Sequence, residues 1–143
     1  MSKRNSIVKA LAEKLKLIDG STPYSVNIYG NAYPYLKFWD EVQNFPCVYM
    51  TPGSEYREYL PGDFKWAFLS ISLKIYCNGE DSSSQLELLL EDIETCVDAN
   101  RVLEYSTGKE TTEILITSIV TDEGLLAPYA VGEINLQVRY ALE

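Results

Sequence analysis

The chain has 143 residues, with 12 Lys and Arg against 21 Asp and Glu, no His and three Cys. This length suits one domain over residues 1–143, which would bury roughly two-thirds of the surface that the unfolded chain exposes. Without His the chain lacks the commonest general base and metal ligand, which excludes His-based triads, imidazole zinc sites and His pH switches. The formal net charge of −9 argues against a protein that holds duplex DNA through clustered Lys and Arg.

The first predicted element is an amphipathic helix over residues 6–18. Its apolar residues recur at spacings of four, four and three: Ile7, Leu11, Leu15 and Ile18. Asn5 or Ser6 is expected to cap its start, and Asp19-Gly20 to end it. The cations of the basic N-terminal segment, in and before this helix, are Lys3, Arg4, Lys9, Lys14 and Lys16. We interpret them as a solvated face, with contact to a phosphate or an acidic partner as the alternative.

No apolar stretch of signal-peptide length follows the basic N-terminus, and no apolar run approaches the roughly 20 residues that cross a bilayer. We therefore expect synthesis in a cytoplasm and no membrane partner. The three cysteines, Cys47, Cys77 and Cys96, form no CxxC pair, and each lies in or beside an apolar run. This pattern predicts free, buried core thiols.

Five prolines interrupt residues 21–62. An alternating pattern predicts a short strand over Tyr24–Tyr29, followed by a turn or loop over 30–34. A second strand is predicted over Phe45–Thr51. Because proline cannot donate a hydrogen bond to a sheet, we expect Pro46 and Pro52 at the ends of that strand.

The strongest strand pattern covers Phe64–Cys77. One face is apolar at every second residue: Ala67, Leu69, Ile71, Leu73, Ile75 and Cys77. The opposite face begins with three aromatic residues and then turns polar. Pro61-Gly62-Asp63 is a turn signal, so Tyr56–Leu60 is expected to pair back on this strand as a hairpin arm.

Six aromatic residues gather along this hairpin: Tyr49, Tyr56, Tyr59, Phe64, Trp66 and Phe68. Tyr and Trp offer large, stiff contact areas and are enriched in protein interfaces. The sequence leaves two interpretations open, contact with another subunit or partner and a local aromatic mini-core. A platform for stacking nucleic-acid bases is disfavoured, because only Arg57 and Lys65 lie among these residues.

A second helix is predicted over residues 82–100, because apolar residues recur there at helical spacing: Leu86, Leu89, Leu90, Ile93, Cys96 and Val97. Ser82 with Gln85, or Ser84 with Glu87, has the three-residue offset of a capping box. The region from residue 80 to 98 contains acidic and no basic residues: Glu80, Asp81, Glu87, Glu91, Asp92, Glu94 and Asp98. We expect these acids to form an anionic surface on the solvent side of the helix.

The remaining pattern is extended. Val102–Tyr105 is short, and Thr112–Thr121 is rich in β-branched residues, with Ile114, Ile116 and Val120 expected on one face. The last strand is apolar at every second residue: Ile134, Leu136, Val138, Tyr140 and Leu142. The order of elements predicts an α+β fold, a mostly antiparallel sheet with two helices packed on one face, plus an extended β-hairpin arm.

The residues predict no catalytic group, cofactor or metal site. The adjacent acids Glu91-Asp92 and Asp122-Glu123 fit a solvated surface better than a general acid and base, because neighbours on a helix do not face each other. Asp122 and Glu123 also lack the spaced Asp/Asn loop of a calcium site. No phosphate-binding glycine motif occurs, and Ser82-Ser83-Ser84 is explained by helix initiation. A small carboxylate-based hydrolase or sugar-binding domain is the alternative from a different class.

Several local sequences, and the order of elements, resemble the tail terminator proteins of long-tailed bacteriophages. The resemblance rests on SIVKAL at 6–11, WAFLSISLKIY at 66–76, the helix around 86–97, ITSI at 116–119 and GEINLQVRY at 132–140. It leaves residues 30–61 without a match. The resemblance implies a homohexameric ring in the virion tail that caps the tail tube, stops its polymerisation and offers its other face to head-completion or neck proteins. Another neck component, such as a head-tail connector subunit, is the close alternative.

A closed ring needs two different patches that meet head to tail on neighbouring subunits. We expect the subunit or partner interface at Tyr56, Tyr59, Phe64, Trp66 and Phe68, against a neighbour's helix or sheet. We also expect an acidic surface that repels DNA passing through the ring, at Glu87, Glu91, Asp92, Glu94 and Asp98. Specific nucleic-acid binding is not expected.

Overall fold

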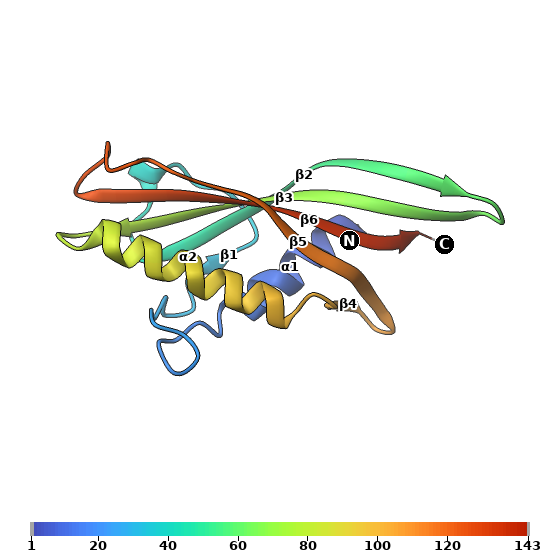
Figure 1. Cartoon of the computed structure of the whole chain (residues 1–143), viewed down its shortest axis with the longest axis horizontal. Helices are drawn as coiled ribbons and strands as arrows, with labels where there is room; N and C mark the ends of the chain where they lie inside the picture. The colour runs from blue at the N-terminus through green and yellow to red at the C-terminus, as the bar shows by residue number, and fades with distance from the viewer. Residues whose placement is uncertain (1, 143) are drawn as a thin grey trace.

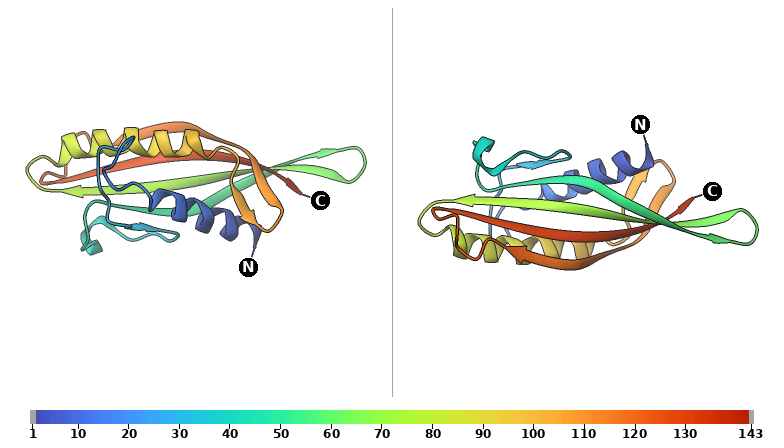
Figure 2. Two further views of the ribbon diagram at one scale, coloured as in Figure 1. Left: turned by 90° about the horizontal axis from the view of Figure 1, so that it is seen from below. Right: turned by 90° about the horizontal axis from the view of Figure 1, so that it is seen from above.

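A computed structural model of the chain describes residues 2–142, apart from the side chain of Trp39. Its elements in chain order are α1 (Lys3–Leu15), β1 (Ala32–Tyr33), the 3-10 turn η1 (Trp39–Glu41), β2 (Cys47–Leu60), β3 (Phe64–Asn78), α2 (Ser82–Ala99), β4 (Glu104–Ser106), β5 (Lys109–Thr121) and β6 (Tyr129–Leu142). The strands form one sheet in the order β1-β2-β3-β6-β5-β4, antiparallel except for the β1–β2 pair. Both helices lie on one side of this curled sheet (Figures 1 and 2), which confirms the predicted α+β fold.

α1 begins and ends earlier than predicted. Ser2 is the N-cap, and its Oγ accepts a hydrogen bond from the Asn5 N–H at 3.1 Å, so the expected caps Asn5 and Ser6 are wrong. The helix ends at Leu15 because the N–H of Ile18 donates to the Leu15 carbonyl, a tighter turn than an α-helix makes. Ile18 is still buried in the core, which explains why it fits the apolar period of the helix.

The strand predicted over Tyr24–Tyr29 is wrong. In the described chain this segment makes an isolated bridge, between Asn27 and Asp19, and no strand. Two of its backbone N–H groups donate instead to the carboxylate of Asp92 in α2. A tertiary hydrogen-bond acceptor has therefore replaced the sheet partner that the alternating pattern suggested.

β2 joins two segments that were predicted separately, Phe45–Thr51 and Tyr56–Leu60. Pro46 directly precedes β2, as expected, but Pro52 lies inside the strand, where the register shifts between Pro52 and Glu55. Proline is tolerated there because β1, which forms within the predicted 30–34 loop, pairs only with the start of β2 and leaves the later outer edge unpaired in the described chain.

β3 and the hairpin arm confirm the prediction. All six apolar residues of the expected core face are fully buried. Tyr56 lies opposite Phe68 and Leu60 opposite Phe64, so β2 pairs with β3 up to the turn. In Figure 1 this hairpin extends well beyond both helices.

α2 confirms the second predicted helix, and its apolar stripe is buried against the sheet. The capping boxes are wrong, because Asp81 is the N-cap and no side chain caps the helix. The helix lies close to β6 at Gly132, where an added Cβ would stand 3.1 Å from Leu86 Cδ1 and 3.4 Å from Leu90 Cδ2. Glycine at this position therefore lets the helix pack tightly on the sheet.

β5 departs from the predicted alternation. A register shift between Ile116 and Ser118 places one extra residue in the strand. An extra residue exchanges the two faces of the strand beyond it. Ile119 therefore pairs with the core residue Ile134 and shares its face, whereas Val120, expected beside Ile114 and Ile116, faces the other way and is 53% exposed.

The core combines both helices with the facing sides of β2, β3, β5 and β6. The three cysteines are free and buried, which confirms their prediction as core residues. Cys47 belongs to a second, smaller cluster with Val42, Tyr49 and Tyr76, on the side of the sheet away from the helices.

Candidate functional site

The side of the sheet opposite α1 and α2 is covered by neither of these two helices (Figure 2). Successive strand residues point to opposite faces, and paired residues on neighbouring strands share a face. We define the open sheet face as the even-numbered residues 64–76 of β3 together with the residues paired to them in β2 and β6. It divides into an aromatic part on the arm, a polar middle and a tyrosine-rich end.

The aromatic part consists of Tyr56, Phe64, Trp66 and Phe68, which we call the aromatic arm. The Tyr56 and Phe68 rings are stacked, with centroids 4.6 Å apart and planes at 8°. Phe64 meets Trp66 edge to face at 5.0 Å, and the Arg139 guanidinium lies 4.7 Å from the Trp66 ring centroid. Tyr56 is 57% exposed, and the other three are half-buried. The structure thus brings together four of the five predicted interface residues.

Tyr59, the fifth, lies on the other face of the arm. It pairs with Lys65, whose Nζ is 5.2 Å from the Tyr59 ring centroid, and it is 69% exposed. Arg57 shares this face, because it pairs with the core-facing Ala67. The arm therefore has one aromatic face and one cationic face. Residues on the helix side of the sheet are buried where the helices cover them. On the arm they are exposed, because the arm passes beyond both helices.

Tyr49, which the sequence also grouped with the arm, belongs to the far end of the open sheet face. Its ring stacks on Tyr33 at 4.9 Å and meets Tyr35 and Tyr76 edge to face at 5.7 and 6.0 Å. Burial raises the pKa of Tyr49 to about 12 and also raises that of Tyr76, so both phenols stay neutral. These tyrosines form a local cluster, the second of the two interpretations that the sequence left open.

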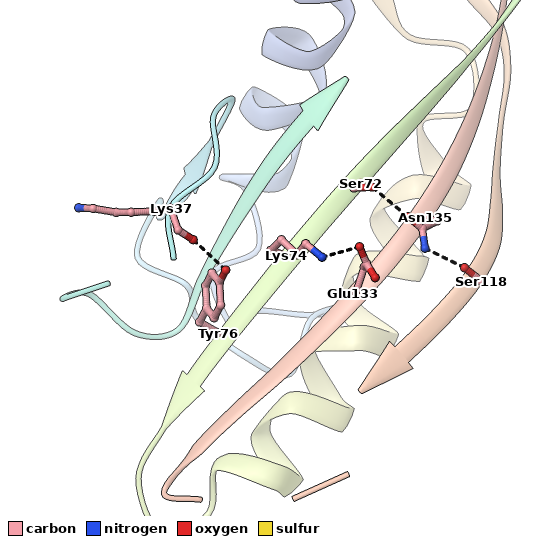
Figure 3. A network of polar contacts seen from close by, with 7 residues as sticks. All are labelled: Lys37, Ser72, Lys74, Tyr76, Ser118, Glu133 and Asn135. Carbon is pink, nitrogen blue, oxygen red and sulfur yellow. Dashed lines mark hydrogen bonds and ion pairs between the residues drawn. The ribbon is translucent and has the colours of Figure 1, made fainter. Parts of the chain in front are cut away.

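The Tyr76 hydroxyl donates to the Lys37 carbonyl at 2.8 Å and so anchors the preceding loop over this end of the sheet (Figure 3). The anchored loop and the sheet border a pocket of about 330 Å³, whose lining includes Leu36, Phe38 and Lys74. Phe38 is 74% exposed. This end therefore offers a further apolar surface.

Cross-strand polar pairs occupy the middle of the open sheet face (Figure 3). Lys74 Nζ lies 2.5 Å from Glu133 Oε1, and Ser72 Oγ donates to Asn135 Oδ1 at 3.0 Å. Asn135 Nδ2 in turn donates to Ser118 Oγ at 2.9 Å. Such pairs, partly exposed, fix strand register more than they add stability. These polar pairs keep the middle of the open sheet face hydrated, between two apolar ends.

A buried carboxylate holds the base of the arm on the helix side. Glu55 Oε1 accepts a hydrogen bond from the Tyr140 hydroxyl at 2.5 Å, and Glu55 Oε2 lies 2.8 Å from an Arg57 nitrogen. Burial, and then the Glu55 hydrogen bond, raise the pKa of Tyr140, so the hydroxyl remains a donor. The sequence did not predict this contact, because nothing in it distinguishes Glu55 from an exposed surface acid.

Of the acids predicted for the DNA-repelling surface, Glu87, Glu91, Glu94 and Asp98 are exposed on α2, and we call these four the acidic stripe. The predicted exposure is wrong for Asp92, which is 3% exposed. The Asp92 carboxylate accepts hydrogen bonds from the Ser25 N–H at 3.0 Å and the Val26 N–H at 2.8 Å. The burial of Asp92 could have been predicted from the sequence, because Asp92 falls on the apolar stripe of the helix, three residues after Leu89.

The four acids of the acidic stripe are spaced by four, three and four residues, so they share one side of α2. A hollow lined by Glu87 and the end of β5, including Thr121, shows that this side faces the β5 edge. The opposite flank of α2 lies against the loop that contains Val26.

The remaining residues considered as possible acids, ligands or nucleophiles have structural roles. Asp122 Oδ2 accepts from the Leu126 N–H at 3.0 Å, which fixes the loop between β5 and β6. Burial raises the pKa of Cys47 and Cys77 to about 12, so neither thiol is activated as a nucleophile. Within residues 2–142, no cluster of three or more His, Cys, Asp or Glu side chains is suited to a metal ion. No helix of the described chain is long and apolar enough to span a membrane.

Comparison with known proteins gives a consistent result. Residues 1–143 match a family described as bacteriophage tail tube terminator proteins. The chain is 40% identical over 152 residues to "Tail tube terminator protein p142" of Escherichia phage T5, an alignment that covers 98% of this chain and 94% of that protein. A chain in the solved virion of a native gene transfer agent particle has the same fold, with a TM-score of 0.63, 10% identity and 95% of each chain covered.

Proposed function

The chain belongs to the bacteriophage tail tube terminator proteins, and we propose that it forms a homohexameric ring that caps the tail tube, stops its polymerisation and presents its other face to head-completion or neck proteins. Family membership already establishes the coarser statement. The chain is a structural protein of the phage virion tail and not an enzyme. The alternative of a carboxylate-based hydrolase or sugar-binding domain is therefore set aside.

The observation that carries the ring proposal is the aromatic arm. Four aromatic side chains are presented on a hairpin that projects beyond both helices (Figure 1), where Tyr56 is exposed and the other three are half-buried. Aromatic side chains and Arg are the residues that contribute most to protein interfaces. The stacked Tyr56–Phe68 pair, and Trp66 under Arg139, are held rigid before binding, which lowers the entropy lost on contact.

The ring also has to let DNA pass, and the charge of the subunit supports this. The acidic stripe is part of a formal net charge of −9 per subunit. Acidic groups repel phosphates over a range of about 8 Å at physiological ionic strength. We propose that this charge keeps DNA from adhering to the ring, with no specific nucleic-acid site involved.

Electron microscopy of the protein added to purified tail tubes tests this function and separates it from that of another neck component. The proposal predicts a six-fold ring at one end of each tube, with the second end free. Protein that binds neither tube end would refute the terminator ring, and protein that binds only isolated heads would favour a connector.

A further inference from the structure

One edge of the sheet is long and unpaired. β4 pairs with β5 only at Lys109 and Glu110, so within residues 2–142 no strand lies along the outer edge of β5 over residues 112–121. This edge has the sequence TEILITSIVT, with one charge, no proline and no glycine. Leu115, Ile119 and Val120 are 38%, 44% and 53% exposed. Natural proteins usually protect such an edge with charges, prolines or a covering element.

The opposite edge of the same sheet is also unpaired along the arm. β1 pairs with β2 at Val48 and Tyr49, and beyond the register shift of β2 the outer edge of Glu55–Leu60 has no partner strand in the described chain. β2 and β6 run in the same direction and β5 runs against both. A rotation about an axis along the strands preserves these directions. Neighbours related in this way would therefore bring β2 of one copy antiparallel to β5 of the next.

We propose that the arm strand of one subunit, Glu55–Leu60, adds to the β5 edge, residues 112–121, of the neighbouring subunit, so that the sheets of successive copies become continuous. This inference rests on the proposed ring and supplies the second patch that head-to-tail closure requires. Addition of a strand to an exposed sheet edge is a common recognition mode, because the unpaired backbone groups on both sides are satisfied together.

Both faces of the arm match what flanks the β5 edge. When sheets join edge to edge, the helix side of one continues the helix side of the other. On that side the arm carries Lys65, Tyr59 and Arg57, which is paired with Glu55 of its own subunit, and the neighbour carries the acidic stripe beside its β5 edge. Opposite charges across an interface select the partner and its register. Two cations, one of them already paired with Glu55, against four acids also leave the joined surface negative, as the DNA proposal requires.

The open side adds apolar contacts. There the arm presents Tyr56 and its three aromatic companions together with Glu58, and the β5 edge presents Leu115 and Val120 together with Glu113 and Ser118. Leu115 and Val120 would therefore meet the aromatic arm on one side of the joined sheet, and cations would meet anions on the other. A partner other than a second copy would have to reproduce both features at once.

Hydrogen exchange of the backbone amides tests the pairing directly, with the free subunit compared to the ring in solution or on tail tubes. Residues 112–121 and 55–60 are expected to exchange at least about tenfold more slowly in the ring. The exposed β4–β5 turn, residues 106–108, serves as the internal control and should not change. Rings without slower exchange at 112–121 would overturn the inference and leave the ring itself standing.

A charge exchange provides the second test. Lys65→Glu and Glu91→Lys are each expected to raise the concentration needed for assembly about tenfold, and the double variant to restore most of the loss. Glu104→Lys, an exposed acid on β4, is the control and should assemble normally. Double-variant assembly no better than that of the singles would contradict the charge contact.

Two further outcomes are decisive. A two-subunit particle with slower exchange at 112–121 but not at 55–60 would show that β5 pairs with another β5, which overturns the arm assignment. A chain that stays monomeric both in solution and on tail tubes would refute the proposed ring, and with it the inference.

Discussion

The buried Asp92 gives the most sharply quantified prediction for the subunit. Its carboxylate accepts three hydrogen bonds from two backbone N–H groups, those of Ser25 and Val26, and so ties the loop after α1 to α2. Val26 is buried, and Asp92→Ala would leave its N–H without an acceptor. A buried donor left unsatisfied costs about 1–3 kcal/mol, whereas water can replace the bond at exposed Ser25. We therefore expect a loss of about 2 kcal/mol in the free energy of unfolding.

Urea denaturation of the free subunit measures this loss, and the thermal midpoint should fall by roughly 4–8 °C. Asp92→Asn keeps one acceptor oxygen and should lose about half as much. Glu94→Ala, on the exposed side of the same helix, is the matched control and should stay within about 0.5 kcal/mol of the natural chain. If Asp92→Ala were as mild as Glu94→Ala, the loop would not depend on this carboxylate and the reasoning would be wrong.

Three other changes have defined expected results. Replacing Trp66 and Phe68 together with Ser should impair ring formation more than folding, and intact hexamers in sedimentation would exclude the aromatic arm as an interface. Leu89→Ala, which truncates a fully buried side chain of α2, should lower the free energy of unfolding by about 2–5 kcal/mol, and an unchanged thermal midpoint would contradict the packing described. Burial raises the pKa of Cys47 and Cys77 from 9.0 to about 12, so on raising the pH the unfolded chain loses these protons first, and the stability present below pH 9.0 is lost toward about pH 12. Denaturation from about pH 8 to 11 should show this decline, less steeply after Cys47→Ala and Cys77→Ala, and equal slopes would contradict it.

Period-two and helical patterns were sufficient where a single apolar face decides the structure. β3 and α2 were predicted nearly to their ends, because one side of each must meet the core, and the hairpin arm was predicted from the turn signal Pro61-Gly62-Asp63. The predictions failed where a single tertiary contact or one extra residue determines the local structure. The Asp92 carboxylate replaced the predicted strand at Tyr24–Tyr29, and the register shift after Ile116 moved Val120 to the opposite face.

The candidate site was predicted in part for the same reason. Alternation along β3 put Phe64, Trp66 and Phe68 on one face, and the structure confirms that they share it with Tyr56. Alternation also puts Tyr59, three residues after Tyr56, on the opposite face of the arm, and the predicted interface set did not take this into account. The unpaired β5 edge could not be foreseen at all, because an edge is defined only once the order of strands in the sheet is known.

The central claim is that a ring of this chain ends tail tube growth, and tube elongation in its presence tests this most directly. When the chain is added to polymerising tail tube protein, elongation should stop, and each tube should carry six copies of the chain, all at its one capped end. Tubes that continue to lengthen at the same rate, with the chain free in solution or scattered along their sides, would contradict the account.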